Sequence, residues 1–146
     1  PDAELITLLG DGCFFFGVPS SAYWVAGTYN APHLTIIYNN GGWKSPRLST
    51  VYVHPDGPAE RNDNYFVSVG AGAQLSKIAE MTGGATGFYV EDRALLADTL
   101  RQAMEVVRGG KPINLALKPY RSVLIGWMAR TEAIKRPKGD LDGLGT

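Results

Sequence analysis

Short apolar runs of strand length alternate with segments of helical periodicity along most of this chain. The runs Ala3–Leu9 and Leu34–Tyr38 are separated by a stretch that begins at Pro19 and places apolar residues at helical spacing. A proline suits the first turn of a helix, and the β-branched residues of the second run suit a buried strand. Strands that alternate with helices in this way predict an α/β fold, a parallel sheet with helices on both faces.

The remaining elements follow from the same patterns and from Gly and Pro between them. Besides the two runs already named, strands are expected at Tyr65–Val69, Gly87–Val90 and Pro112–Leu117. Helices are expected from Pro19 to about Asn30, over Gln74–Met81, from the N-cap Asp92 to Gly109, and over residues 120–135. Residues 43–64 lack periodicity and contain three prolines, which predicts a long loop with room for a short helical turn.

Composition and charge limit the function classes. Of 146 residues, 45% are hydrophobic, which suits one globular domain. Fourteen basic and fourteen acidic side chains cancel, so the basic face that a nucleic-acid binder needs is not expected. A single cysteine, Cys13, excludes an internal disulfide, and the apolar runs are too short to span a bilayer. We expect a cytoplasmic protein without a membrane partner.

The start of the chain bears on domain organisation. Pro1-Asp2 leads within a few residues into a strand of buried type, and there is no initiating methionine. We therefore expect part of a longer polypeptide, with a fold incomplete at its N-terminus, so organelle targeting stays open. Residues 1–136 are expected to form the domain, and residues 137–146 a flexible tail.

Two polar turns follow directly on the first two expected strands. Gly10-Asp11-Gly12 comes after the first, and Asn39-Asn40-Gly41-Gly42 comes after the second. Ligands bind at the carboxyl ends of strands in open α/β sheets, and strands joined by one helical crossover are usually close together. The carboxylate of Asp11, the amide oxygen of Asn40 and a nearby backbone carbonyl are ligands that Mg²⁺ prefers, together with phosphate and water.

A Gly-Asp-Gly, 26 residues and then an Asn-Asn pair resemble the signature of thiamine-diphosphate-dependent enzymes. The surrounding sequence is similar to the branch of acetolactate synthases and 2-oxoacid decarboxylases, up to about residue 118. In this resemblance Asp11 and Asn40 match the metal-binding residues, and Gly42 matches the position that donates a carbonyl oxygen. The implied cofactors are thiamine diphosphate and Mg²⁺.

The resemblance also implies a diphosphate cradle, formed by Gly10, Gly12 and the backbone of Cys13. Cys13 stands where similar enzymes commonly have Ser, so here only the backbone contact to diphosphate is implied. A structural role for Cys13 is favoured over a nucleophilic one, because no histidine is close in the sequence. Trp43 follows the metal-binding turn, where it would either wall the cofactor site or pack in the core.

The implied function is the cofactor-binding portion of a carboligase or decarboxylase acting on a 2-oxoacid such as pyruvate. Two alternatives stay open: chemistry like that of 2-hydroxyacyl-CoA lyase or oxalyl-CoA decarboxylase, and a truncated module that binds cofactor without catalysis. In similar enzymes the activating glutamate lies on a pyrimidine-binding domain, usually of a partner subunit. We therefore assign no catalytic residue in this chain, and expect a homo-oligomer and no turnover by the chain alone.

Several other residues have plainer interpretations. Gly70-Ala71-Gly72-Ala73 suggests a dinucleotide loop, but Leu75 stands where the fingerprint needs Gly, so a helix start is favoured. His33 is expected to pack at a strand, whereas His54 lies in the long loop and is a weak candidate for substrate contact. Packing roles are expected for the aromatic residues Phe14–Phe16, Trp24 and Trp127.

Overall fold

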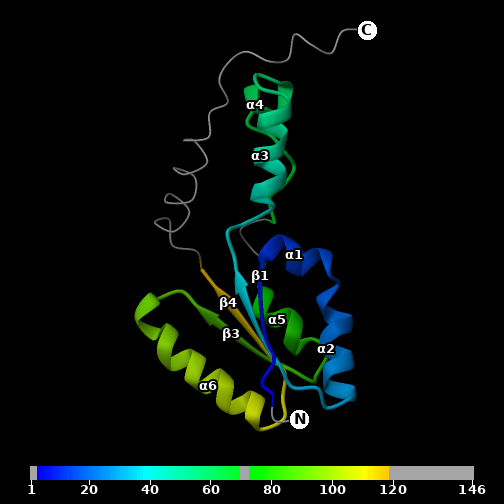
Figure 1. The fold of residues 1–146 in the computed structure, drawn as a ribbon, viewed down its shortest axis with the longest axis vertical. Helices are drawn as coiled ribbons and strands as arrows, with labels where there is room; N and C mark the ends of the chain where they lie inside the picture. The colour runs from blue at the N-terminus through cyan, green and yellow to red at the C-terminus, as the bar shows by residue number, and fades with distance from the viewer. Residues whose placement is uncertain (1–2, 70–72, 119–146) are drawn as a thin grey trace.

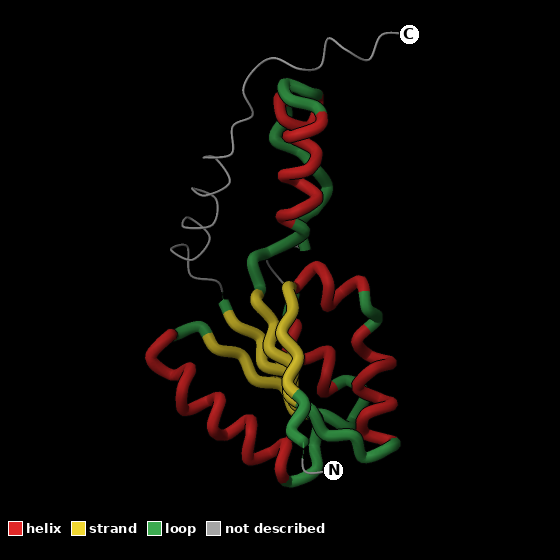
Figure 2. Tube along the Cα trace, viewed as in Figure 1, coloured by secondary structure: helices red, strands yellow, loops and turns green. Residues whose placement is uncertain are grey.

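The computed structural model describes residues 3–69 and 73–118, which form an α/β domain around a four-stranded sheet (Figures 1 and 2). All neighbouring strands are parallel, in the order β1-β2-β4-β3. The strands are β1 (Ile6–Gly10), β2 (Leu34–Tyr38), β3 (Thr86–Val90) and β4 (Ile113–Leu117). Gly10 pairs with Tyr38 and Tyr38 with Leu117, so these strands end level with one another. The predicted parallel sheet is confirmed.

Helices cover both faces of this sheet, as predicted. Figure 1 shows α1, α2 and α5 on one face and α6 on the other, while α3 and α4 rise from the carboxyl edge. The helices are α1 (Asp11–Phe16), α2 (Pro19–Thr28), α3 (Lys44–Val53), α4 (Pro58–Arg61), α5 (Leu75–Glu80) and α6 (Leu96–Arg108), with a 3-10 turn at Arg93–Leu95. Asp92 caps this turn, because its carboxylate accepts a hydrogen bond from the Ala94 N–H at 2.9 Å.

The two faces form two separate cores because side chains alternate along each strand. In β4, Ile113 and Leu115 pack toward Ala103 and Val107 of α6. Ala116, the residue after Leu115 in β4, packs instead in the cluster of α1, α2 and α5. Each fully buried Leu or Ile contributes about 1.5–3 kcal/mol to the stability of the fold. The sheet is thus a rigid base for whatever lies at its carboxyl edge.

The long loop predicted over residues 43–64 is wrong in most of its length. Residues Lys44–Val53 form a ten-residue helix, and Pro58–Arg61 form a short one. Pro46 lies in the first turn of α3 and Pro58 at the start of α4, where the missing N–H has no cost. Neither helix buries a residue, so no apolar stripe marked them in the sequence. We call α3 and α4 the arm.

The strand predicted at Tyr65–Val69 is also wrong. This segment makes one isolated antiparallel bridge, between Gly42 and Ser68, and not a ladder. Phe66 has a backbone φ of +52°, which an extended strand does not allow. The aromatic and β-branched composition of this segment is typical of a strand. The backbone conformation at Phe66 nevertheless leaves a single bridged residue pair, Gly42 and Ser68.

Several aromatic residues expected to pack are exposed. Phe14 is buried at 3% exposure, but Phe16 is 85% exposed and Trp24 is 58% exposed. The edge strand β1 also exposes Leu8, whose register partner Ile36 packs in the cluster of α6, so Leu8 lies on the α6 face at the edge of the sheet. Trp127, the expected helix at 120–135, the expected tail at 137–146 and most of the Gly70–Ala73 segment lie outside the described residues. Among those described, no helix has the length and apolar character to cross a membrane.

Candidate functional site

Asp11 lies at the junction where β1 ends and α1 begins, so the predicted turn is a strand-to-helix junction. Its side chain is 1% exposed, although Asp is among the residue types least often buried without a partner. One carboxylate oxygen, Oδ1, accepts the Gly12 N–H at 3.0 Å. The other, Oδ2, is buried and has no hydrogen-bond partner within the described part of the chain. Such an oxygen is costly unless a cation or donor satisfies it.

The two asparagines at the end of β2 have different roles. Asn39 closes its own turn, because its Oδ1 accepts the Gly41 N–H at 3.2 Å and its N–H donates to the Leu117 carbonyl at 3.1 Å. Asn40 keeps its side-chain oxygen Oδ1 buried and without a partner among the residues described. The structure therefore leaves one uncommitted oxygen on each turn, at Asp11 and at Asn40.

Gly42 is held by the segment that follows the arm. The Trp43 N–H donates to the Val67 carbonyl at 2.8 Å, and the Val69 N–H donates to the Gly41 carbonyl at 3.1 Å. Gly42 has φ of +152°, and a Cβ there would lie 2.1 Å from the Val67 oxygen. Its own carbonyl oxygen accepts the Lys44 N–H at 3.1 Å, which leaves a second lone pair for another ligand.

Trp43 joins the two turns physically. A Cβ built on Gly12 would lie 2.7 Å from Cδ1 of the Trp43 ring, so only glycine permits this close approach. Because Gly12 follows Asp11 and Trp43 follows Gly42, this contact brings the predicted metal-binding residues of both turns to one place. The predicted proximity of the two turns is confirmed. Trp43 itself is partly buried, so it both packs and borders the site.

The N-terminal turn of α1 offers backbone donors beside this place. The first N–H groups of a helix have no intrahelical backbone acceptor; in α1 the Gly12 N–H donates to Asp11 Oδ1, and the Cys13 N–H follows it. Gly10 has open space where a Cβ would be, so its backbone can be approached closely. The residues expected to cradle diphosphate thus flank Asp11 directly in the junction between β1 and α1.

Cys13 shares a cavity with a histidine, although no histidine is close to it in the sequence. Cys13, Tyr23, His33 and Thr35 line a small cavity of about 150 Å³. The His33 ring stacks on Tyr23, with centroids 5.6 Å apart, which agrees with the predicted packing role of His33. Burial raises the pKa of Tyr23 to about 12, against a smaller lowering by Thr35, so the hydroxyl stays neutral near pH 7.

We expect Cys13→Ser to keep at least half of the activity of the intact enzyme and its cofactor affinity. The side chain is exposed and its place in the site is defined by the backbone, which Ser preserves. Steady-state assay and calorimetric titration of thiamine diphosphate check this. A nucleophilic Cys13 would instead give an inactive variant with normal cofactor affinity.

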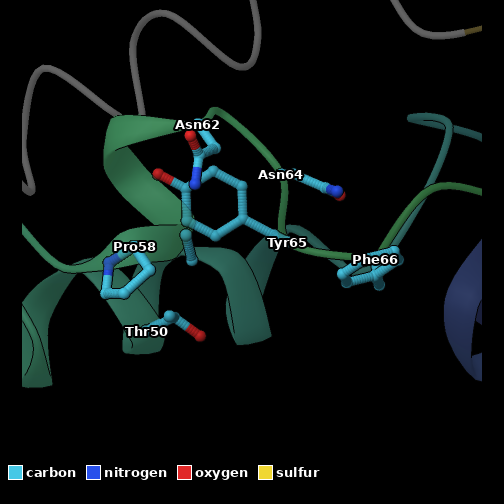
Figure 3. A pocket seen from close by; sticks show the side chains of 7 residues that line it. Thr50, Pro58, Asn62, Asn64, Tyr65 and Phe66 are labelled. Carbon is cyan, nitrogen blue, oxygen red and sulfur yellow. The ribbon is translucent and has the colours of Figure 1, made fainter.

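His54 is not brought to the site. It follows the last residue of α3, a helix of ten residues that begins at Lys44 beside the Asn39–Gly42 turn. A helix of that length carries the chain about 15 Å away. Residues that the sequence interpretation missed lie closer, where the arm meets the turn: Lys44, Arg47, Tyr65 and Phe66 line a cavity that also reaches Gly41. Figure 3 shows the neighbouring pocket, where Tyr65 lies among Thr50, Pro58 and Asn62, with Phe66 further along the chain.

The fold and the site define a parallel α/β domain with a polar ligand site at the carboxyl edge of adjacent strands. Residues 1–114 match the family described as "Thiamine pyrophosphate enzyme, C-terminal TPP binding domain". This chain belongs to that family. It is therefore a thiamine-diphosphate-binding domain, as the resemblance implied.

Solved structures show the same fold. A protein from Mycobacterium smegmatis, assigned as a thiamin diphosphate-dependent enzyme, is 19% identical with a TM-score of 0.54. Benzoylformate decarboxylase from Polynucleobacter necessarius is 11% identical with a TM-score of 0.58. Each likeness covers 81% of this chain, but the chain spans only 18% and 20% of those two proteins. No curated protein sequence matches the chain.

Proposed function

We propose that this chain is the diphosphate-binding portion of an enzyme that breaks or forms a carbon–carbon bond next to the carbonyl of a 2-oxoacid. Within this class we favour an acetolactate-synthase-like carboligase or a 2-oxoacid decarboxylase. Family membership supports the cofactor, and the resemblance of the flanking sequence supports the branch. The metal part of the proposal is supported by two buried oxygens without a partner among the described residues, Asp11 Oδ2 and Asn40 Oδ1.

Mg²⁺ fits these residues by the chemistry of the donors. One carboxylate oxygen, one amide oxygen and one backbone carbonyl are hard ligands, and Mg²⁺ completes its octahedron with phosphate oxygens and water. Asp11, Asn40 and the Gly42 carbonyl would hold the ion. Gly10, Gly12 and the Cys13 N–H would face the diphosphate, with Trp43 closing the gap between the turns. This arrangement satisfies both orphaned side-chain oxygens at once.

The bound cofactor supplies the carbon nucleophile and electron sink for the reaction, and the protein supplies orientation and electrostatics. The described residues of this chain anchor one end of the cofactor. We propose that a pyrimidine-binding domain, of the same or a partner subunit, activates the other end. We also propose a homo-oligomer, because a partner subunit that supplies this domain would place the site at a subunit interface.

The two asparagines provide a matched test of the metal assignment. We expect Asn40→Ala to weaken Mg²⁺-dependent binding of thiamine diphosphate by about tenfold or more, the size typical of metal-site mutations. Asn39→Ala should weaken it only a few-fold, because the Asn39 oxygen already accepts the Gly41 N–H. Calorimetric titration of the intact protein at fixed Mg²⁺ gives both affinities. Equal losses, or a larger loss for Asn39, would remove Asn40 from the metal site.

A further inference from the structure

The turn after β2 contains the one Asn-Gly pair of the sequence, Asn40-Gly41. Asparagine is a thermolabile residue type, because the backbone nitrogen of the next residue can attack its side-chain amide. Glycine in the next position leaves that nitrogen unhindered. Gly41 is exposed, and a Cβ built on it would meet nothing within 4 Å. The turn therefore places a chemically labile pair at one of the proposed metal ligands.

The side-chain amide of Asn40, whose carbon Cγ would be attacked, is not tied down through its oxygen. Asn40 Oδ1 is buried and has no hydrogen-bond partner among the described residues. The oxygen of Asn39, in contrast, is already an acceptor within the turn. In the absence of metal, the described structure thus leaves the electrophile of the reaction without this restraint.

The attacking nitrogen, which belongs to Gly41, is held by the fold. Its N–H donates to Asn39 Oδ1 at 3.2 Å, and the Gly41 carbonyl accepts the Val69 N–H at 3.1 Å. Asn39 is itself fixed to the sheet, because its N–H donates to the Leu117 carbonyl at 3.1 Å. The Gly41 N–H must break its bond to Asn39 before the nitrogen can approach Asn40 Cγ and release its proton.

We propose that Asn40 is a deamidation site and that Asn39 restrains the reaction by holding the Gly41 N–H. The Gly41 nitrogen bonds to Asn40 Cγ, the Cγ–Nδ2 bond breaks, and Nδ2 leaves as ammonia with the proton of the Gly41 N–H. Water then opens the cyclic imide, at Cγ to give aspartate or at the backbone carbonyl to give isoaspartate. The reaction consumes only water and needs no oxidant or reductant.

Either product would alter the proposed metal site, and this consequence rests on the proposed function. Aspartate replaces the neutral oxygen of Asn40 with a second carboxylate besides that of Asp11. Isoaspartate adds one methylene group to the backbone before Gly41, which strains the bridge between Gly42 and Ser68. The hydrogen bond from Gly41 to Asn39 thus protects the chemical identity of a proposed ligand.

The rate of conversion at Asn40 tests the proposal. The intact protein is incubated without metal at one fixed pH and temperature, and peptide mass spectrometry follows the product. We expect Asn39→Ala to deamidate about two- to tenfold faster than the parent, the factor that corresponds to one hydrogen bond. Asn39→Asp keeps an acceptor for the Gly41 N–H and should match the parent. Asn39→Ser offers a weaker acceptor in such turns and should lie between them.

The same proteins in denaturant control for unfolding. There the parent and the Asn39 variants should share one rate, faster than in any folded protein, because the hydrogen bond exists only in the folded turn. Equal rates at Asn40 in the folded parent and folded Asn39→Ala would overturn the proposal. A parent that deamidates as fast folded as denatured would do so too. If circular dichroism shows that Asn39→Ala does not fold, the comparison of Asn39→Ser with the parent decides in the same way.

The proposed function can fail separately. Mg²⁺ bound to Asn40 Oδ1 would hold the electrophile, so Mg²⁺ with thiamine diphosphate should slow deamidation of Asn39→Ala several-fold. If they give no protection while the Asn39 variants keep the expected order, the metal assignment of Asn40 is wrong and the deamidation proposal stands. If they protect Asn40 but the metal-free variants and the parent react equally fast, the deamidation proposal is wrong and the metal assignment stands.

Discussion

Replacing Asp11 with alanine is expected to abolish Mg²⁺-dependent binding of thiamine diphosphate, with a loss of at least about a hundredfold in affinity. Asp11 is the only charged side chain among the proposed metal ligands, so it supplies the attraction that the neutral oxygens of Asn40 and Gly42 lack. Calorimetric titration of the cofactor into the intact enzyme at fixed Mg²⁺ measures the loss. Unchanged affinity would remove Asp11 from the site.

The thermal stability of the metal-free protein should not fall in Asp11→Ala, although the cofactor affinity does. In the absence of metal, Asp11 Oδ2 is buried with no partner in the described structure, and such an atom costs about 1–3 kcal/mol. Asp11→Ala should therefore unfold at the same or a higher temperature than the parent when Mg²⁺ is removed with a chelator. Asp11→Asn keeps the shape and removes the charge, so it should lose affinity nearly as much. A large drop in melting temperature would mean that Asp11 serves the fold.

Gly42→Ala should damage both the site and the fold. The added Cβ would lie 2.1 Å from the Val67 carbonyl oxygen and 3.1 Å from the Ser68 Cα, which are backbone atoms that cannot rotate away. The bridge between Gly42 and Ser68, which joins the Asn39–Gly42 turn to the segment after the arm, would have to shift. We expect a loss of about 1–3 kcal/mol in the free energy of unfolding and at least about tenfold in cofactor affinity. Denaturant unfolding and calorimetry measure these two quantities.

Gly41→Ala is the matched control for that variant. Gly41 also has a positive φ, of +82°, but a Cβ there would meet nothing within 4 Å. Only the backbone strain remains, of roughly 1 kcal/mol. We expect Gly41→Ala to lose less stability than Gly42→Ala and to keep most of the cofactor affinity. Equal losses in the two variants would show that strain and not the contact with Val67 decides the effect.

The sheet and its carboxyl edge could be predicted from the sequence because they rest on local signals. Leu34–Tyr38 was predicted within its observed bounds, and a β-branched run that ends in Asn-Asn-Gly-Gly fixes both the strand and its end. Asp11 and Asn40 follow from the same reasoning, since parallel strands joined by one crossover end at the same edge. These inferences depend on residues close in sequence.

What could not be predicted depends on contacts distant in sequence or on burial. The arm buries no residue, so its helices left no periodic pattern, and its prolines stand at helix starts where they are tolerated. Trp43 and Gly12 are in contact although they are 31 positions apart, so no sequence pattern predicts this contact. Likewise, Lys44 and Phe66 line one cavity although they are far apart in the sequence, and the positive φ of Phe66 could not be predicted from its residue type.

The most direct test of the central claim is a crystal structure of the intact protein with thiamine diphosphate and Mg²⁺. We predict one Mg²⁺ coordinated by Asp11 Oδ2, Asn40 Oδ1 and the Gly42 carbonyl oxygen, at about 2.0–2.1 Å, with diphosphate oxygens among its other ligands. The diphosphate should lie against the backbone of Gly10, Gly12 and Cys13. A metal held by other residues, or a diphosphate bound away from the turn of Asp11, would contradict the account.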